Sequence, residues 1–92
     1  MTTTITSNDF QRRADALYDS LIQLESSADQ EQLFLCSYLL GHISLISAEN
    51  GDSTAQFDQL LQLSLDTALE IDQLSEQDKL DITELWQQLR SQ

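Results

Sequence analysis

The fold follows from one stretch of sequence, QEQLFLCSYLLGHISLISAEN at residues 30–50, in which apolar residues fall on nearly every side of a helix. Asp29 followed by Gln32 is the pattern of a helix N-cap. Asn50-Gly51 supplies a stop, because glycine readily adopts the left-handed conformation just past a helix end. We therefore expect a helix over 30–50, and we expect it to be the most buried element of the protein.

Three further helices flank this stretch. Upstream, apolar residues step by four, three, four and three residues, which predicts a helix over 8–25. Downstream, Ser53 with Gln56 forms a capping box that opens a helix over 54–71, and Ser75 caps a fourth over 76–90. The apolar stripes of these three helices are Phe10, Ala14, Leu17, Leu21 and Leu24; Phe57, Leu60, Leu61, Ala68 and Ile71; and Ile82, Leu85, Trp86 and Leu89.

The joints between these helices are short and polar, and the sequence contains no proline. Short connections make successive helices antiparallel neighbours. The sequence therefore predicts an all-α, antiparallel (up-down-up-down) four-helix bundle over residues 8–92, preceded by a flexible N-terminal tail over 1–7.

The chain carries 16 acidic and four basic residues, a net charge of −12 over 92 residues. This charge repels phosphate backbones and anionic lipid head groups, so we expect neither a nucleic acid nor a membrane as partner. It favours a protein partner with a basic face. A single cysteine, Cys36, cannot form an intramolecular disulfide, and the N-terminus lacks the pattern of a secretory signal. We expect a cytoplasmic protein.

Gly41 lies in the middle of the predicted second helix, where glycine costs about 1 kcal/mol relative to alanine. It belongs to a line of small residues formed by Ser37, Gly41, Ser44 and Ala48. Such a line allows another backbone to approach closely. We expect that backbone to come from within the bundle, in preference to a homodimer.

Tyr38 and His42 lie one turn apart on the same helix and could together perform acid–base chemistry. Their helical neighbours are mostly apolar, and Glu49 lies two turns from His42, a rise of about 10 Å. These surroundings favour a structural histidine that pairs with a carbonyl or a carboxylate on another helix. Trp86 lies on an apolar stripe, so we interpret it first as a core residue and second as an interface anchor.

The spacing of the potential ligands predicts no metal site and no cofactor. A di-iron bundle needs Glu-x-x-His on two helices, but this chain has one histidine, and Leu39 precedes it at that offset. Cys36 and His42 point to different sides of their helix, so they cannot bind one zinc ion together. We also find no catalytic set of residues.

Acidic residues gather around the last joint, where Lys79 alone opposes them. They are Glu70, Asp72, Glu76, Asp78, Asp81 and Glu84. A solvated surface is the simpler interpretation of such a cluster, and a docking face for a basic partner is the alternative.

Several short stretches of the chain together resemble the YfcL family of small bacterial proteins. They are Leu33-Phe34, the run Ser37 to Leu45, Leu74-Ser75, Asp78 and the run Ile82 to Trp86. Tyr38-Leu-x-Gly41-His42, with Trp86 at the matching distance, is the most specific part of the resemblance. The chain departs from the family pattern at Leu40, where a basic residue is frequent. The resemblance implies a helical cytosolic protein of about this length, brings no catalytic residues to this chain, and singles out Tyr38, Gly41, His42 and Trp86.

These observations predict a non-enzymatic protein–protein interaction module with an acidic helical surface. The alternative is a small-molecule binder or enzyme that uses a site at Tyr38 and His42.

Overall fold

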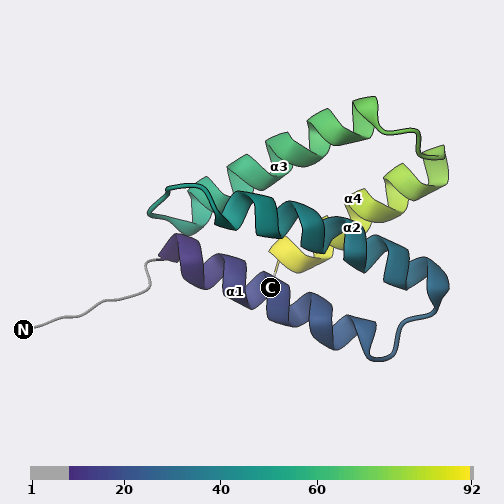
Figure 1. The fold of residues 1–92 in the computed structure, drawn as a ribbon, viewed down its shortest axis with the longest axis horizontal. Coiled ribbons are helices and arrows are strands. Elements are labelled where there is room, and N and C mark those ends of the chain that lie inside the picture. Colours follow the sequence, from purple (N-terminus) through teal and green to yellow (C-terminus); the bar gives the residue numbers. More distant parts are fainter. Residues whose placement is uncertain (1–8, 92) are drawn as a thin grey trace, which may run out of the picture.

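The computed structural model describes residues 9–91, which form four helices (Figure 1). They are α1 (Asp9–Glu25), α2 (Gln30–Ser47), α3 (Thr54–Ile71) and α4 (Glu76–Arg90). Successive helices run in roughly opposite directions in Figure 1. The described part of the chain contains no strand, so the predicted all-α class and the four helices are confirmed. The tail predicted over 1–7 lies outside the described residues.

Side-chain caps start three of the helices. The side chains of Asp29 and Ser75 each accept a hydrogen bond from the backbone N–H three residues on, at 2.9 and 3.0 Å. Ser53 and Gln56 exchange both bonds of a capping box, as the sequence predicts. These caps satisfy N–H groups that have no partner within their own helix.

The predicted end of the second helix is wrong. Helix α2 stops at Ser47, with Ala48 as a right-handed C-cap, and Gly51 does not have a positive φ. Gly51 serves a different purpose, since a Cβ at this position would overlap the ring of Phe10. That ring is fully buried and packs edge-on against Phe57, with the centroids 5.1 Å apart. The loop therefore needs glycine here for space.

Buried residues from all four helices form one hydrophobic core. Trp86 is its largest side chain, and the Trp86 indole N–H donates to Gln62 Oε1 at 2.9 Å. Arg13 joins three helices: its guanidinium donates to both oxygens of Asp58 at 2.9 and 3.1 Å, and to the carbonyl of Arg90 at 3.0 Å. Helix α3 packs against α1 and α2, whereas α4 packs mainly against α2.

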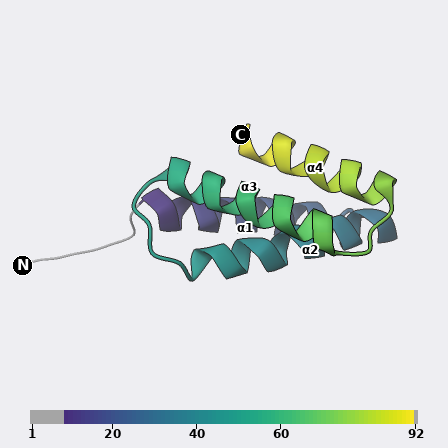
Figure 2. The same ribbon diagram turned by 90° about the horizontal axis from the view of Figure 1, so that it is seen from above.

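Helix α2 has four buried residues, as many as α1 and more than α3 or α4, yet it also leaves large apolar side chains exposed. Leu33, Phe34 and Leu45 are 38%, 42% and 60% exposed. In Figures 1 and 2, α1, α3 and α4 do not surround α2, so one flank of this helix lies open. A helix that is apolar on all sides is normally buried on all sides. The open flank of α2 is therefore an exception that needs an explanation.

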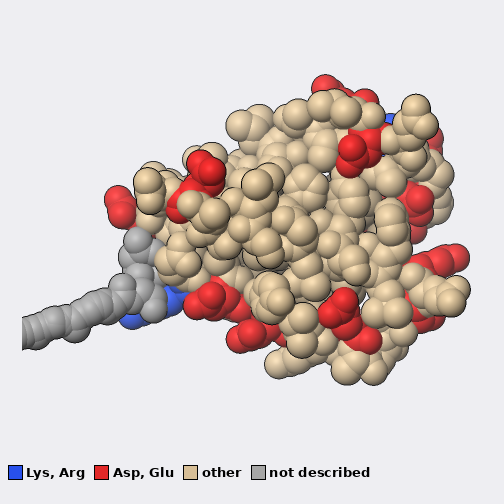
Figure 3. Space-filling view, viewed as in Figure 1, with Lys and Arg blue, Asp and Glu red and all other residues tan. Residues whose placement is uncertain are grey.

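Two other residues predicted for the core stripes are exposed, Leu24 at 42% and Ile71 at 72%. Figure 3 shows the face on which α2 lies, where carboxylates stand around a broad area of uncharged side chains. None of the described helices combines the length and apolarity needed to cross a bilayer.

Candidate functional site

Tyr38 and His42 lie together on α2 and contact the C-terminal half of α3. The Tyr38 hydroxyl donates to Asp72 Oδ2 at 2.7 Å, and His42 Nδ1 lies 2.8 Å from Ser64 Oγ. The Tyr38 and His42 ring centroids are 5.0 Å apart. The partner of His42 lies on another helix, but it is a serine hydroxyl and not the predicted carbonyl or carboxylate.

Burial and Asp72 set the protonation states of this pair. Burial, followed by the hydrogen bond to Asp72 and the charge of Asp72, raises the pKa of Tyr38 to about 12. Burial also lowers the pKa of His42, while the charge of Asp72 opposes that change. At neutral pH, Tyr38 is therefore a phenol and His42 is a neutral imidazole.

A shallow hollow of about 490 Å³ opens beside His42, between α2 and α3. We call it the α2/α3 groove. Its residues are His42, Ile46, Glu49, Leu60, Leu63, Ser64, Thr67, Ala68, Ile71 and Asp72. Two of them, Leu63 and Ile71, are 64% and 72% exposed. His42 forms its hydrogen bond through Nδ1. Because the described residues include no buried side-chain nitrogen or oxygen without a partner, Nε2 of His42 reaches solvent.

A serine hydroxyl bonded to an imidazole is the start of a nucleophile–base pair. Ser64, however, lies inside α3, where the neighbouring backbone N–H groups bond within the helix. They are not available to stabilise a developing oxyanion. The arrangement is suited to hydrogen bonding and packing.

Gly41 and Trp86 do not belong to this cluster. Gly41 is exposed, and a Cβ added there would meet nothing within 4 Å, so no other backbone among residues 9–91 packs against it. The predicted intramolecular packing at Gly41 is therefore wrong. Trp86 is fully buried in α4, with the Arg90 guanidinium 5.5 Å from its ring centroid. The structure makes Trp86 a core residue, the first of the two interpretations.

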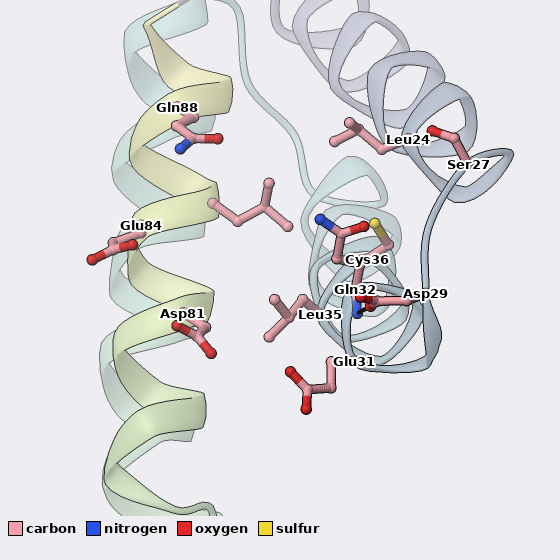
Figure 4. A pocket seen from close by; sticks show the side chains of 11 residues that line it. Leu24, Ser27, Asp29, Glu31, Gln32, Leu35, Cys36, Asp81, Glu84 and Gln88 are labelled. Atoms are coloured by element: carbon pink, nitrogen blue, oxygen red, sulfur yellow. Dashed lines mark hydrogen bonds between the residues drawn. The ribbon is translucent and has the colours of Figure 1, made fainter.

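A second hollow separates α4 from the N-terminal half of α2 (Figure 4). It has a volume of about 450 Å³, and a smaller hollow of about 250 Å³ adjoins it through shared residues. We call the two together the acidic cleft. The apolar residues that line it are Leu24, Phe34, Leu35, Cys36 and Leu85, and the acidic ones are Asp29, Glu31, Asp78, Asp81 and Glu84. In Figure 4, Glu31 and Leu35 face α4 across the opening, with Asp81 on the opposite helix.

The predicted acidic face is divided in the structure. Asp78, Asp81 and Glu84 line the acidic cleft, whereas Asp72 lines the α2/α3 groove and holds Tyr38. Glu70 and Glu76 are exposed and line neither hollow, and Glu76 lies 3.7 Å from Lys79. Neither hollow is lined by a lysine or an arginine.

The other polar groups of these sites offer little further chemistry. The thiol of Cys36 is buried, and burial followed by the charge of Glu25 raises its pKa, so it stays protonated. Over residues 9–91, no three His, Cys, Asp or Glu side chains are grouped closely enough to hold a metal ion.

Two residues of these sites were missed from the sequence. Glu31 lies about 50 positions before Asp81 in the chain, so nothing local indicates that the two share a cleft. Ser64 lies among the apolar residues of the stripe predicted for the helix over 54–71. Its polarity on that stripe was the signal that a half-buried polar group on another helix would pair with it.

Comparisons with known proteins identify the family of this chain. The model of the YfcL protein family matches residues 8–91. The "Uncharacterized protein YfcL" of Escherichia coli (strain K12) is 32% identical over 88 residues, which cover 91% of this chain and 92% of that protein. No solved structure is matched. With a family match over nearly the whole chain and a relative of this similarity, the chain belongs to the YfcL family.

Proposed function

We propose that this protein is a non-enzymatic interaction module that binds a basic segment of another protein in the acidic cleft. One observation carries the proposal: carboxylates from both α2 and α4 line the cleft together with apolar side chains, and neither lysine nor arginine lines it. Apolar contact supplies affinity to such a site, and the carboxylates select and steer a basic partner.

The arrangement of the helices supports the same proposal. We further propose that the helices form an antiparallel four-helix bundle in which α4 packs mainly on α2 and contacts α3 through Trp86 and Gln62. The cleft lies along the α2–α4 contact, so a segment bound there would bury apolar side chains that the bundle leaves exposed. We further propose a cytoplasmic location, which the free thiol of Cys36 supports.

A photo-crosslinking amino acid at Gln88, which lines the cleft, tests the proposal in native lysate. The matched control carries the same group at Asp15, an exposed position on α1. We expect one dominant product from position 88 alone, crosslinked within a segment rich in lysine or arginine. Identical products from both positions would contradict the proposal.

Charge variants test the role of the carboxylates once that partner is in hand. Asp81→Asn with Glu84→Gln should lower the association rate and leave the helical circular dichroism signal unchanged. Asp15→Asn with Asp19→Asn, on α1, removes the same charge elsewhere. Binding should also weaken between physiological salt and 1 M, because the Debye length falls from about 8 to about 3 Å. Binding that ignores both changes would contradict docking in the cleft.

A small-molecule site at Tyr38 and His42 is the second candidate function. The observation that favours it is the position of His42, which lines the α2/α3 groove with Nδ1 held by Ser64. A ligand there would shift the ring signals of His42, the one histidine of the chain, without affecting the acidic cleft.

A further inference from the structure

A row of side chains runs along the open flank of α2. Phe34, Tyr38, His42 and Leu45 follow one another at intervals of four, four and three residues, which places them on one side of the helix. The rings of Phe34 and Tyr38 lie 6.2 Å apart, and those of Tyr38 and His42 lie 5.0 Å apart. The first three members therefore form a continuous aromatic strip.

This strip joins the two hollows. Phe34 lines the acidic cleft at one end, and His42 lines the α2/α3 groove at the other. Alongside Tyr38 and His42, the exposed Leu63 and Ile71 of α3 continue the apolar surface. The apolar side chains left exposed in this region thus form one surface.

The charges along this surface have a single sign. Glu31 and Asp81 stand at the end formed by the cleft, Asp72 lies beside Tyr38 in the middle of the strip, and Glu49 lines the groove. The four basic residues of the chain are Arg12, Arg13, Lys79 and Arg90, and none of them lines either hollow. A second copy of this chain would bring a further charge of −12 to the surface. A cationic partner is the complementary one.

We propose that the acidic cleft, the aromatic strip and the α2/α3 groove are one docking surface for a basic amphipathic helix of another protein. The apolar side of that helix would pack on Tyr38, Leu63 and Ile71. Its lysines or arginines would face the carboxylates at both ends of the surface. The inference rests on the proposed function, since the cleft forms one end of the surface.

The length of the surface sets the length of the partner segment. Glu31 and Ile46 line opposite ends and are fifteen residues apart on α2. At 1.5 Å per residue this separation is about 22 Å. A partner helix of about four turns spans it.

The test uses a synthetic peptide of about 16 residues, with leucines at helical i, i+3, i+4 and i+7 spacing and lysines elsewhere. Two control peptides replace all leucines by serine or all lysines by glutamate. Amide shifts of the ¹⁵N-labelled protein and titration calorimetry report where the peptide binds and with what stoichiometry. We expect one peptide per protein, shifts in both hollows and along the strip, and no binding of either control peptide.

Substitutions at the two ends then separate the contributions. Leu63→Ser with Ile71→Ser should weaken binding by about tenfold, because two exposed apolar contacts are lost. The matched control, Ile22→Ser with Leu33→Ser, changes exposed apolar residues that line neither hollow, and it should bind like the parent. Glu31→Gln with Asp81→Asn should weaken binding and flatten its salt dependence.

The possible failures differ in what they contradict. Shifts confined to the cleft would overturn the single surface and leave the proposed function standing. Shifts confined to the groove, or two peptides bound independently, would also overturn the single surface, and the groove-only result would remove the proposed function as well. Equal binding of the all-serine control would show charge attraction alone and overturn the inference.

Discussion

The two glycines of the chain have opposite surroundings. Gly41 lies within α2 on an exposed side, where an added Cβ meets nothing. Gly51 lies in the α2–α3 loop, where an added Cβ overlaps the buried Phe10 ring. The same substitution at the two positions should therefore have effects of opposite sign.

We predict that Gly51→Ala lowers the free energy of unfolding by about 1–3 kcal/mol, because the core around Phe10 must shift to make room. Gly41→Ala should raise it by up to about 1 kcal/mol, because alanine is the better helix former at an exposed position. Urea unfolding of both variants gives the comparison. If Gly41→Ala lowers the free energy of unfolding, another backbone packs on Gly41 in solution, and a homodimer would be the first arrangement to test.

The sequence could not assign these two roles, since both depend on distant contacts. A glycine in a helix and a glycine after a helix carry familiar local meanings, and local meaning predicted a seam and a stop. The caps at Asp29, Ser53 and Ser75 were predictable because each involves residues three apart in the chain.

At the scale of elements, the helices themselves were predictable from their apolar period, but the coverage of α2 was not. A run that is apolar on all sides indicates how much surface seeks burial, and it does not indicate how much its neighbours can cover. Phe34 and Leu45 therefore look like core residues in the sequence and are exposed in the fold. The acidic residues around the last joint could be recognised as a cluster because they are close in sequence. Glu31 could not be assigned to that cluster, because only the fold brings it to the cleft.

Asp72 connects the end of α3 to two residues of α2, and this connection predicts a pH dependence. The folded pKa of Tyr38 is about 12, above its ordinary 10.0, so its contribution to stability is present below pH 10 and is lost between pH 10 and 12. The folded pKa of His42 lies below its ordinary 6.5. Its contribution is present above pH 6.5 and is lost as the pH falls through the folded pKa.

Asp72→Asn should lower both pKa values, because the carboxylate raises each of them. The proton signals of His42 report one titration. The titration of Tyr38 is followed by the absorbance of tyrosinate, and the part of that signal that Tyr38→Phe abolishes belongs to Tyr38. Glu70→Gln, an exposed change two residues away on α3, is the control and should move neither value. A pKa of His42 that rises in Asp72→Asn would contradict the role assigned to this carboxylate.

For the whole molecule, the charge imbalance should make stability depend on salt. Sixteen acidic residues face four basic ones, and two of the ion pairs, Arg12–Asp9 and Lys79–Glu76, are largely exposed and contribute little. Arg13–Asp58 is mostly buried, with side chains 12% and 14% exposed, so salt screens it weakly. Repulsion among the remaining carboxylates is therefore the main electrostatic effect that salt can change.

We predict that the urea midpoint rises when sodium chloride increases from about 10 to about 150 mM, as the Debye length falls from about 30 to about 8 Å. A variant with Asp19→Asn, Glu70→Gln and Glu84→Gln has a net charge of −9 instead of −12. It should be more stable than the parent at low salt and respond less to added salt, because the folded state then holds fewer repelling charges. Circular dichroism at both salt concentrations checks that the helices are intact before unfolding. A urea midpoint that falls with added sodium chloride would mean that attraction within ion pairs outweighs repulsion among the carboxylates. That result would contradict the prediction that the excess of carboxylates destabilises the folded chain.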